Sequence, residues 1–188
     1  VSVRRQNDCM VSGGYILVGD SAWMPKPIDA GGIGPALIAG TILGKNVVDA
    51  IEANDVTEKG LWQYHLDFIK EYGYKTAGLE LFRRLVQTLT NEQISYGMKH
   101  FLGNVDVEAI SKGEHPDFSG LSKLGMIIRG AMNKTVANGL KYTSQQNQWL
   151  VEHYGNYPKE PEGFEEWEKS LHKTLDESFA KIATFSKN

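Results

Sequence analysis

The chain has 188 residues, enough for one domain of ordinary size. Hydrophobic residues make up 41% and charged residues 23%, a composition typical of globular proteins and not of disordered or fibrous ones. The formal net charge of −3 carries no basic excess, so we expect no nucleic-acid partner.

The single cysteine, Cys9, excludes an intramolecular disulfide and a cysteine-rich metal site. It fits the reducing cytoplasm, where we expect the protein to be located. The longest uncharged stretch, residues 30–44, contains glycine and proline and is shorter than the roughly 20 apolar residues of a membrane span. Any membrane contact would therefore be peripheral. The chain begins at Val1 within a strand-like pattern, and we expect it to be a fragment.

The first part of the chain carries the strand signals. Residues 1–5 alternate in polarity, and residues 15–18 form an apolar run between glycines, which predicts a strand buried on both faces. A loop rich in glycine and proline follows. A helix pattern then begins at Ile33, with Pro35 in the first turn, where a missing N–H costs nothing. Its small residues, Ala36, Gly40 and Gly44, predict close contact with a neighbouring strand.

From Glu58 onward, apolar residues recur at helical spacing. The predicted helices cover residues 61–69, 79–89, 93–101, 121–132, 136–154 and 164–185. The predicted fold class is α+β by content and mostly α. A strand–loop–helix piece over residues 1–52 closes an α/β domain, and a helical carboxyl-terminal domain over residues 53–188 follows it.

The chemistry is concentrated where the apolar run ends. Asp20 follows Gly19 past the carboxyl end of the predicted strand, the position at which open α/β sheets bind ligands. The glycines of residues 31–34 lie at the start of the next helix, where unpaired N–H groups favour an anionic or electron-rich group. Asp29, in the middle of the loop, is expected to meet water. Taken alone, Asp20 could also be a turn residue that caps nearby amides.

The longer string, residues 19–36, resembles the late flavin-binding motif of FAD-dependent oxidoreductases, a group that includes aromatic hydroxylases and geranylgeranyl reductases. The resemblance implies that Asp20 holds a ribityl hydroxyl of FAD and that Pro27 shapes the loop. It implies a cofactor site made of Gly19, Asp20, Pro27, Gly31, Gly32, Ile33 and Gly34, with the amides of the last four facing the flavin. It assigns no catalytic residue to this chain.

Trp23 stands where the hydroxylases usually carry histidine. The segment Val3-Arg4-Arg5 and the segment Tyr154-Gly155-Asn156-Tyr157-Pro158 are similar to archaeal geranylgeranyl reductases. The resemblance therefore implies the carboxyl-terminal part of a flavin reductase that saturates isoprenoid double bonds. Two departures exist. Ala30 stands where glycine is usual, and the G-x-G-x-x-G segment that binds the FAD pyrophosphate is absent from the sequence.

The isoprenoid lipid is the implied substrate, and Trp23, Met24 and Ile28 are candidates to contact it, or else to pack under the flavin ring. The protein would pair with the missing amino-terminal part or form a homodimer. Two alternatives stay open: another FAD-dependent dehydrogenase or monooxygenase of the same fold, and a truncated helical interaction module without enzymatic activity.

Other polar residues give weaker signals. Arg4 and Arg5 either reach the flavin or its substrate or, as we favour, pair with surface carboxylates. The five histidines show no metal-ligand spacing, so we expect exposed helix positions and no metal site. These histidines are His65, His100, His115, His153 and His172.

Overall fold

The computed structural model describes residues 3–101, 108 and 133–185. Two short strands, β1 (Val11–Ser12) and β2 (Tyr15–Ile16), form an antiparallel hairpin, and a 3₁₀ turn follows at Gly19–Ala22. The helices are α1 (Ile33–Glu52), α2 (Glu58–Leu61), α3 (Gln63–Phe68), α4 (Tyr74–Thr88), α5 (Asn91–His100), α8 (Lys134–Gly155) and α9 (Phe164–Ala183). A π-helical turn at Ile69–Gly73 joins α3 to α4, and a 3₁₀ turn at Pro161–Gly163 precedes α9. The fold class is as predicted, mostly helical with a small β component.

The helix starts follow from local chemistry. Thr90 and Gln93 form a reciprocal capping box at the beginning of α5. The side chain of Asn133 accepts a hydrogen bond from the Val136 N–H at 3.1 Å and so caps α8. The predicted helices at residues 136–154 and 164–185 correspond closely to α8 and α9. The helix predicted at residues 121–132 lies outside the described residues.

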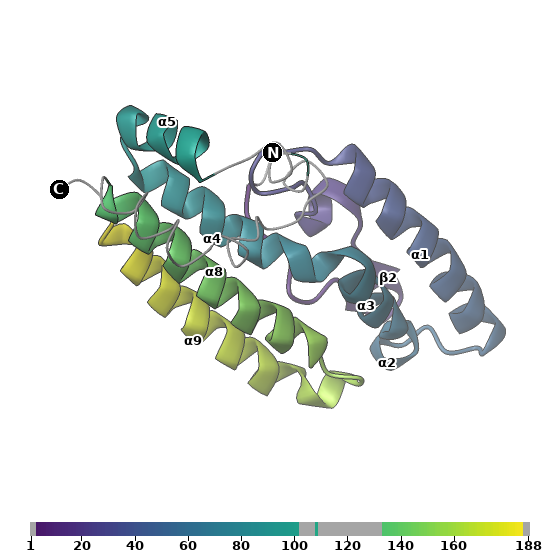
Figure 1. Cartoon of the computed structure of the whole chain (residues 1–188). Coiled ribbons are helices and arrows are strands. Elements are labelled where there is room, and N and C mark those ends of the chain that lie inside the picture. Colours follow the sequence, from purple (N-terminus) through teal and green to yellow (C-terminus); the bar gives the residue numbers. More distant parts are fainter. Residues whose placement is uncertain (1–2, 102–107, 109–132, 186–188) are drawn as a thin grey trace.

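Helices α4, α8 and α9 lie side by side, and α1 lies across the molecule from α9, next to α3 (Figure 1). The contact between α4 and α8 is close because Gly139 has no side chain. A Cβ placed there would stand 2.5 Å from Leu85 Cδ1. A larger residue at position 139 would therefore require the buried Leu85 side chain to move.

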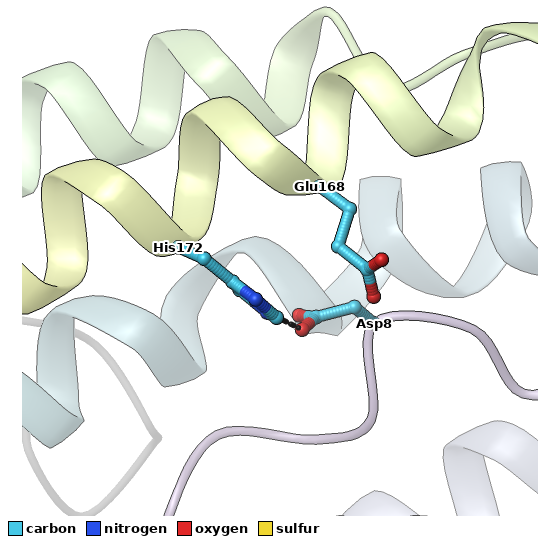
Figure 2. A group of neighbouring side chains, drawn as sticks. All are labelled: Asp8, Glu168 and His172. Atoms are coloured by element: carbon cyan, nitrogen blue, oxygen red, sulfur yellow. Dashed lines mark hydrogen bonds and ion pairs between the residues drawn. The ribbon is translucent and has the colours of Figure 1, made fainter.

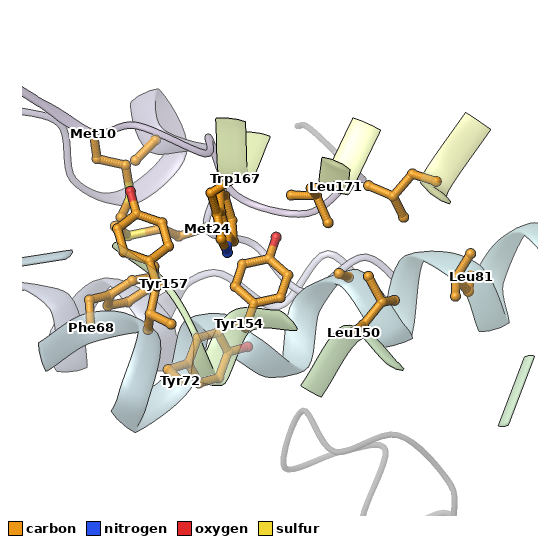
Figure 3. Packing of buried hydrophobic residues seen from close by; sticks show 14 of the residues in the cluster. Met10, Met24, Phe68, Tyr72, Leu81, Leu150, Tyr154, Tyr157, Trp167 and Leu171 are labelled. Carbon is orange, nitrogen blue, oxygen red and sulfur yellow. The ribbon is translucent and has the colours of Figure 1, made fainter. Parts of the chain in front are cut away.

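One hydrophobic core joins the amino-terminal segment to the helices. Met10 and Met24 from the first 52 residues belong to the same buried cluster as Phe68, Tyr154 and Trp167 (Figure 3). The division of the chain at residue 52 stays a prediction, but the two parts are packed together.

The strand prediction for residues 15–18 was wrong in extent. Only Tyr15 and Ile16 are in a strand, and the Tyr15 side chain is 56% exposed. Within the described residues this strand pairs with β1 alone, so its other edge has no strand neighbour. Residues 3–5 form no strand.

The small-residue face of α1 also lacks its expected neighbour in the described part of the chain. A Cβ added at Gly40 or Gly44 would meet no atom within 4 Å. Ile33 and Leu37 are 80% and 68% exposed. Close contact with a strand is therefore not made here, although the helix itself forms as predicted.

Candidate functional site: the loop between β2 and α1

The Gly19–Ala22 turn positions Asp20. Gly19 has φ +67°, a left-handed conformation that glycine adopts without steric cost. The Trp23 N–H donates to the Asp20 carbonyl at 3.1 Å, and the Met24 N–H donates to the Gly19 carbonyl at 3.2 Å. The Asn7 N–H also donates to the Ala22 carbonyl at 3.0 Å, which fixes the turn to the amino-terminal segment. Asp20 itself is exposed.

The carboxylate of Asp20 lies beside the start of α1. A Cβ added at Gly32 would stand 3.3 Å from Asp20 Oδ1 and 3.2 Å from Pro25 Cγ. The Ala36 N–H donates to the Gly32 carbonyl at 3.0 Å, so the preceding amides lie at the open end of the helix. The Asp20 carboxylate, a hydrogen-bond acceptor, thus lies beside the N–H donors at the start of α1. The absence of a side chain at Gly32 leaves the backbone accessible there.

Asp29 stabilises this loop from within. Its carboxylate forms an ion pair with Lys26 at 2.8 Å and accepts a hydrogen bond from the Gly31 N–H at 2.9 Å. Partial burial opposes ionisation, but these hydrogen bonds and the Lys26 charge lower the pKa of Asp29. Asp29 is exposed, as expected, and in addition it holds the loop together. The Gly31 N–H is therefore already engaged by a side chain of the loop, in contrast to the N–H groups of Gly32 and Ile33.

Ala30, which stands where the resembled family usually has glycine, has a strained backbone conformation. Its φ is +58°, in the left-handed region where a Cβ crowds the backbone. Its N–H donates to the Lys26 carbonyl at 2.9 Å, and the Lys26 N–H donates to the Gly31 carbonyl at 3.2 Å. These hydrogen bonds hold the strained residue in place.

The three apolar candidates for substrate contact occupy different environments. Met24 is fully buried, and its sulfur accepts a hydrogen bond from the Gly19 N–H at 3.1 Å, so it packs in the core and presents no surface to a substrate. Trp23 is half-buried, and the Arg4 guanidinium carbon lies 4.0 Å from the centroid of its ring. Ile28 is half-buried against the core, and the preceding residue, Pro27, is buried.

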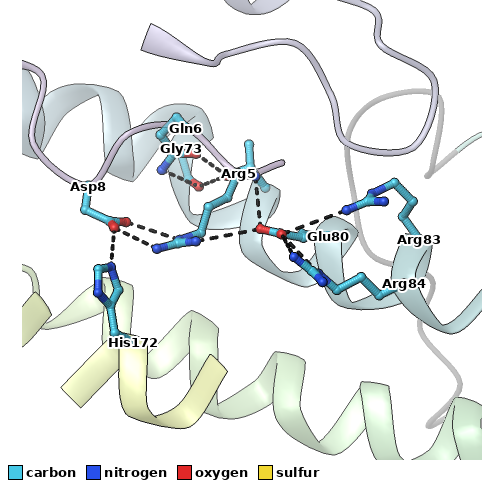
Figure 4. A network of polar contacts seen from close by, with 9 residues as sticks. Arg5, Gln6, Asp8, Gly73, Glu80, Arg83, Arg84 and His172 are labelled. Carbon is cyan, nitrogen blue, oxygen red and sulfur yellow. Dashed lines mark hydrogen bonds and ion pairs between the residues drawn. The ribbon is translucent and has the colours of Figure 1, made fainter. Parts of the chain in front are cut away.

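Arg5 lies inside the protein, 4% exposed (Figure 4). It bonds Asp8 at 2.7 Å and lies 3.7 Å from Glu80, which in turn pairs with Arg84 at 3.0 Å. The preference for surface pairing was therefore wrong for Arg5. The Glu80 partner could not be found from the sequence, since it is 75 positions away and no spacing rule joins it to Arg5.

A second group joins the amino-terminal segment to α9 (Figure 2). His172 Nε2 lies 2.8 Å from Asp8 Oδ2, and ligand atoms of Asp8, Glu168 and His172 all lie within 4.8 Å of one another. These are metal-ligand types. However, the Arg5 guanidinium already bonds both Asp8 oxygens and balances its charge. The group therefore connects the amino-terminal segment to α9.

His65 was expected on an exposed helix position and is instead fully buried. Its Nε2 accepts the Met10 N–H at 3.1 Å, and burial lowers its pKa to about 3. His153 stacks between Trp149 and Trp167. Burial raises the pKa of the Cys9 thiol, whose sulfur contacts the Val11 carbonyl at 3.3 Å, as expected of a packing residue. His115 lies outside the described residues.

The known proteins that are similar to this chain are archaeal reductases. The chain is 33% identical over 179 residues, 94% of its length, to a digeranylgeranylglycerophospholipid reductase of Sulfolobus acidocaldarius. It is 28% identical over 54% of its length to digeranylgeranylglycerophospholipid reductase 2 of Methanopyrus kandleri, and 29% identical over 53% to the reductase of that name from Methanocella arvoryzae. No family model matches the chain.

The chain is thus a homologue of the digeranylgeranylglycerophospholipid reductases, and the predicted resemblance to geranylgeranyl reductases is confirmed. It spans 39% of the length of the Sulfolobus relative and 25% of each of the other two. Among the described residues, no helix has the length and apolar character needed to cross a membrane.

Proposed function

We propose that this chain is the carboxyl-terminal part of a flavin-dependent reductase that saturates double bonds of geranylgeranyl lipids. The similarity over 94% of the chain to a reductase whose name specifies a digeranylgeranyl lipid carries this proposal. The arrangement of Asp20 beside the open start of α1 supports it independently, because it offers what a flavin site needs.

FAD fits the residues of the loop. The Asp20 carboxylate would accept a hydrogen bond from a ribityl hydroxyl, and the amides at the start of α1 would face the electron-rich edge of the ring. A side chain at Gly32 would crowd this approach, whereas Gly34 has open space around it. When bound, the flavin would supply the hydride for reduction of a double bond.

The other loop residues have supporting roles. Gly19 allows the left-handed turn that presents Asp20, and the buried Pro27 gives the loop its rigid course. Gly31 acts through Asp29, to which its amide donates. The direct donors in this proposal are therefore Gly32, Ile33 and Gly34.

The substrate side is proposed to involve Trp23 and Ile28, because both keep partly exposed apolar surface in this loop. Burying an isoprenoid chain contributes roughly 0.8 kcal/mol per methylene, so even a small apolar contact is useful. Peripheral contact with a membrane, from which such a lipid would be taken, belongs to the same proposal.

A chimera tests the proposal. The region of the Sulfolobus acidocaldarius reductase that matches this chain is replaced by these residues, and the product is assayed for bound FAD and for reduction of digeranylgeranyl lipid. We expect both. A folded chimera that holds FAD but reduces no geranylgeranyl lipid would indicate another flavin enzyme. A folded chimera without flavin would overturn the cofactor assignment.

A further inference from the structure

A groove of about 760 Å³ lies on the helical part of the protein, away from the loop between β2 and α1. One wall consists of α3 and the π-helical turn, with α4 beginning beside it. The other wall consists of the end of α8 and the turn that follows. Its volume is in the range of small-molecule binding sites, and π-helical turns occur frequently at functional sites.

The groove is lined largely by apolar groups. Leu66, Ile69 and Tyr74 line it from the first wall, and Val151 and Tyr157 line it from the second. Val151 is 41% exposed, so it offers apolar surface to a ligand in the groove. Such a lining is complementary to an apolar chain.

The charged groups in the groove all have one sign. Lys70, in the π-helical turn, and Lys159 both line it, and no carboxylate does. Both lysines are exposed, and neither forms an ion pair within residues 3–101 and 133–185. The carboxylate next to Lys159 in the chain, Glu160, pairs instead with Lys59 at 3.0 Å. The groove therefore combines apolar walls with two lysines that are the only charged residues of its lining among the described residues.

We infer that this groove binds an isoprenoid lipid with a phosphate head group, its chain against the apolar walls and its phosphate near Lys70 and Lys159. The nature of the chain rests on the proposed function, and the phosphate rests on the charge of the groove. Because no residue of the flavin loop lines the groove, it would be a second lipid contact that holds the head group apart from the reacting double bond.

Calorimetric titration of the 188-residue chain with geranylgeranyl phosphate, below its micelle-forming concentration, tests the inference. We expect one site, with weaker binding of uncharged geranylgeraniol and of inorganic phosphate. The double variant Lys70→Ala, Lys159→Ala should weaken binding of the phosphate at least about tenfold. The matched control is Lys141→Ala, Lys173→Ala, which removes two exposed lysines that do not line the groove.

Val151→Glu tests the apolar wall, because it introduces a carboxylate at an exposed position that should not disturb folding. It should abolish measurable binding, whereas Val48→Glu, at a comparably exposed valine of α1, should not. Absence of binding to the unmodified chain, or equal binding by all variants, would overturn the inference. So would binding only to anionic vesicles or to an acidic peptide. None of these binding measurements involves flavin. The chimera can therefore confirm the proposed function even if the groove binds no lipid, and the groove can bind the lipid even if the chimera holds no FAD.

Discussion

The carboxylate of Asp20 lies against the backbone of Gly32, so that a methyl group on Gly32 would stand 3.3 Å from Asp20 Oδ1. Twelve positions separate the two residues in the chain, and the Gly19–Ala22 turn brings them together. An acceptor for hydroxyl groups therefore lies beside donors at a helix start. The flavin proposal rests on this pairing, and Asp20 therefore gives that proposal its central test.

Asp20→Ala in the chimera should weaken FAD binding about 10- to 150-fold, because a hydrogen bond to a charged acceptor contributes roughly 1.5–3 kcal/mol. Quenching of flavin fluorescence during titration of the apoprotein measures this affinity. Asp49→Ala, which removes an exposed carboxylate from α1, is the control. Equal affinity of the two variants would show that Asp20 does not contact the cofactor.

Ala30→Gly should stabilise the chain by roughly 0.5–1 kcal/mol. Relief of the left-handed strain at φ +58° exceeds the entropy that glycine adds to the unfolded state. Ala53→Gly, at an exposed residue with φ −75°, should instead destabilise it, since that residue has no strain to relieve. Urea unfolding measures both changes. A loss of stability with Ala30→Gly would mean that the loop tolerates the methyl group at no cost.

Stability should fall as pH decreases from about 6.5 because of His65. Its pKa is about 3 in the folded protein and near 6.5 when unfolded, so below pH 6.5 the unfolded chain takes up a proton that the folded chain does not. The expected slope is about 1.4 kcal/mol per pH unit. His65→Gln keeps an acceptor for Met10 and should flatten the slope between pH 6.5 and 5. Any slope that persists comes from other groups with lowered pKa values, among them His153, Asp29 and Glu92. An unchanged slope in the variant would contradict the assignment.

Asp8→Asn should cost about 3 kcal/mol of stability, because it removes a buried partner of Arg5 and leaves that guanidinium with Glu80 at 3.7 Å. Glu160→Gln breaks the exposed ion pair with Lys59 and should cause no measurable change. Thermal unfolding of the two variants compares them directly. Similar melting temperatures would show that the Arg5 network is dispensable for stability.

The sequence by itself determined the elements whose causes are local. The periodicity of residues 136–154 and 164–185 determined α8 and α9, and Pro35 in a first turn indicated where α1 begins. The glycine-rich string of residues 19–36 determined the family resemblance that the comparisons confirm. The sequence placed Ala30 where the resembled family usually has glycine, but only the structure showed the left-handed φ of +58° at this residue.

Only the tertiary structure decided which distant groups meet. Arg5 pairs with Glu80, and the buried His65 accepts a hydrogen bond from the Met10 N–H. Lys70 and Lys159 line one groove. In each case the two residues lie far apart in the chain and are brought together by packing. It also decided that residues 15–18 form no buried strand, because a strand needs neighbours and the described chain supplies only β1. Periodicity shows which face of an element is apolar. It does not show what covers that face, since burial is a property of the whole packed molecule.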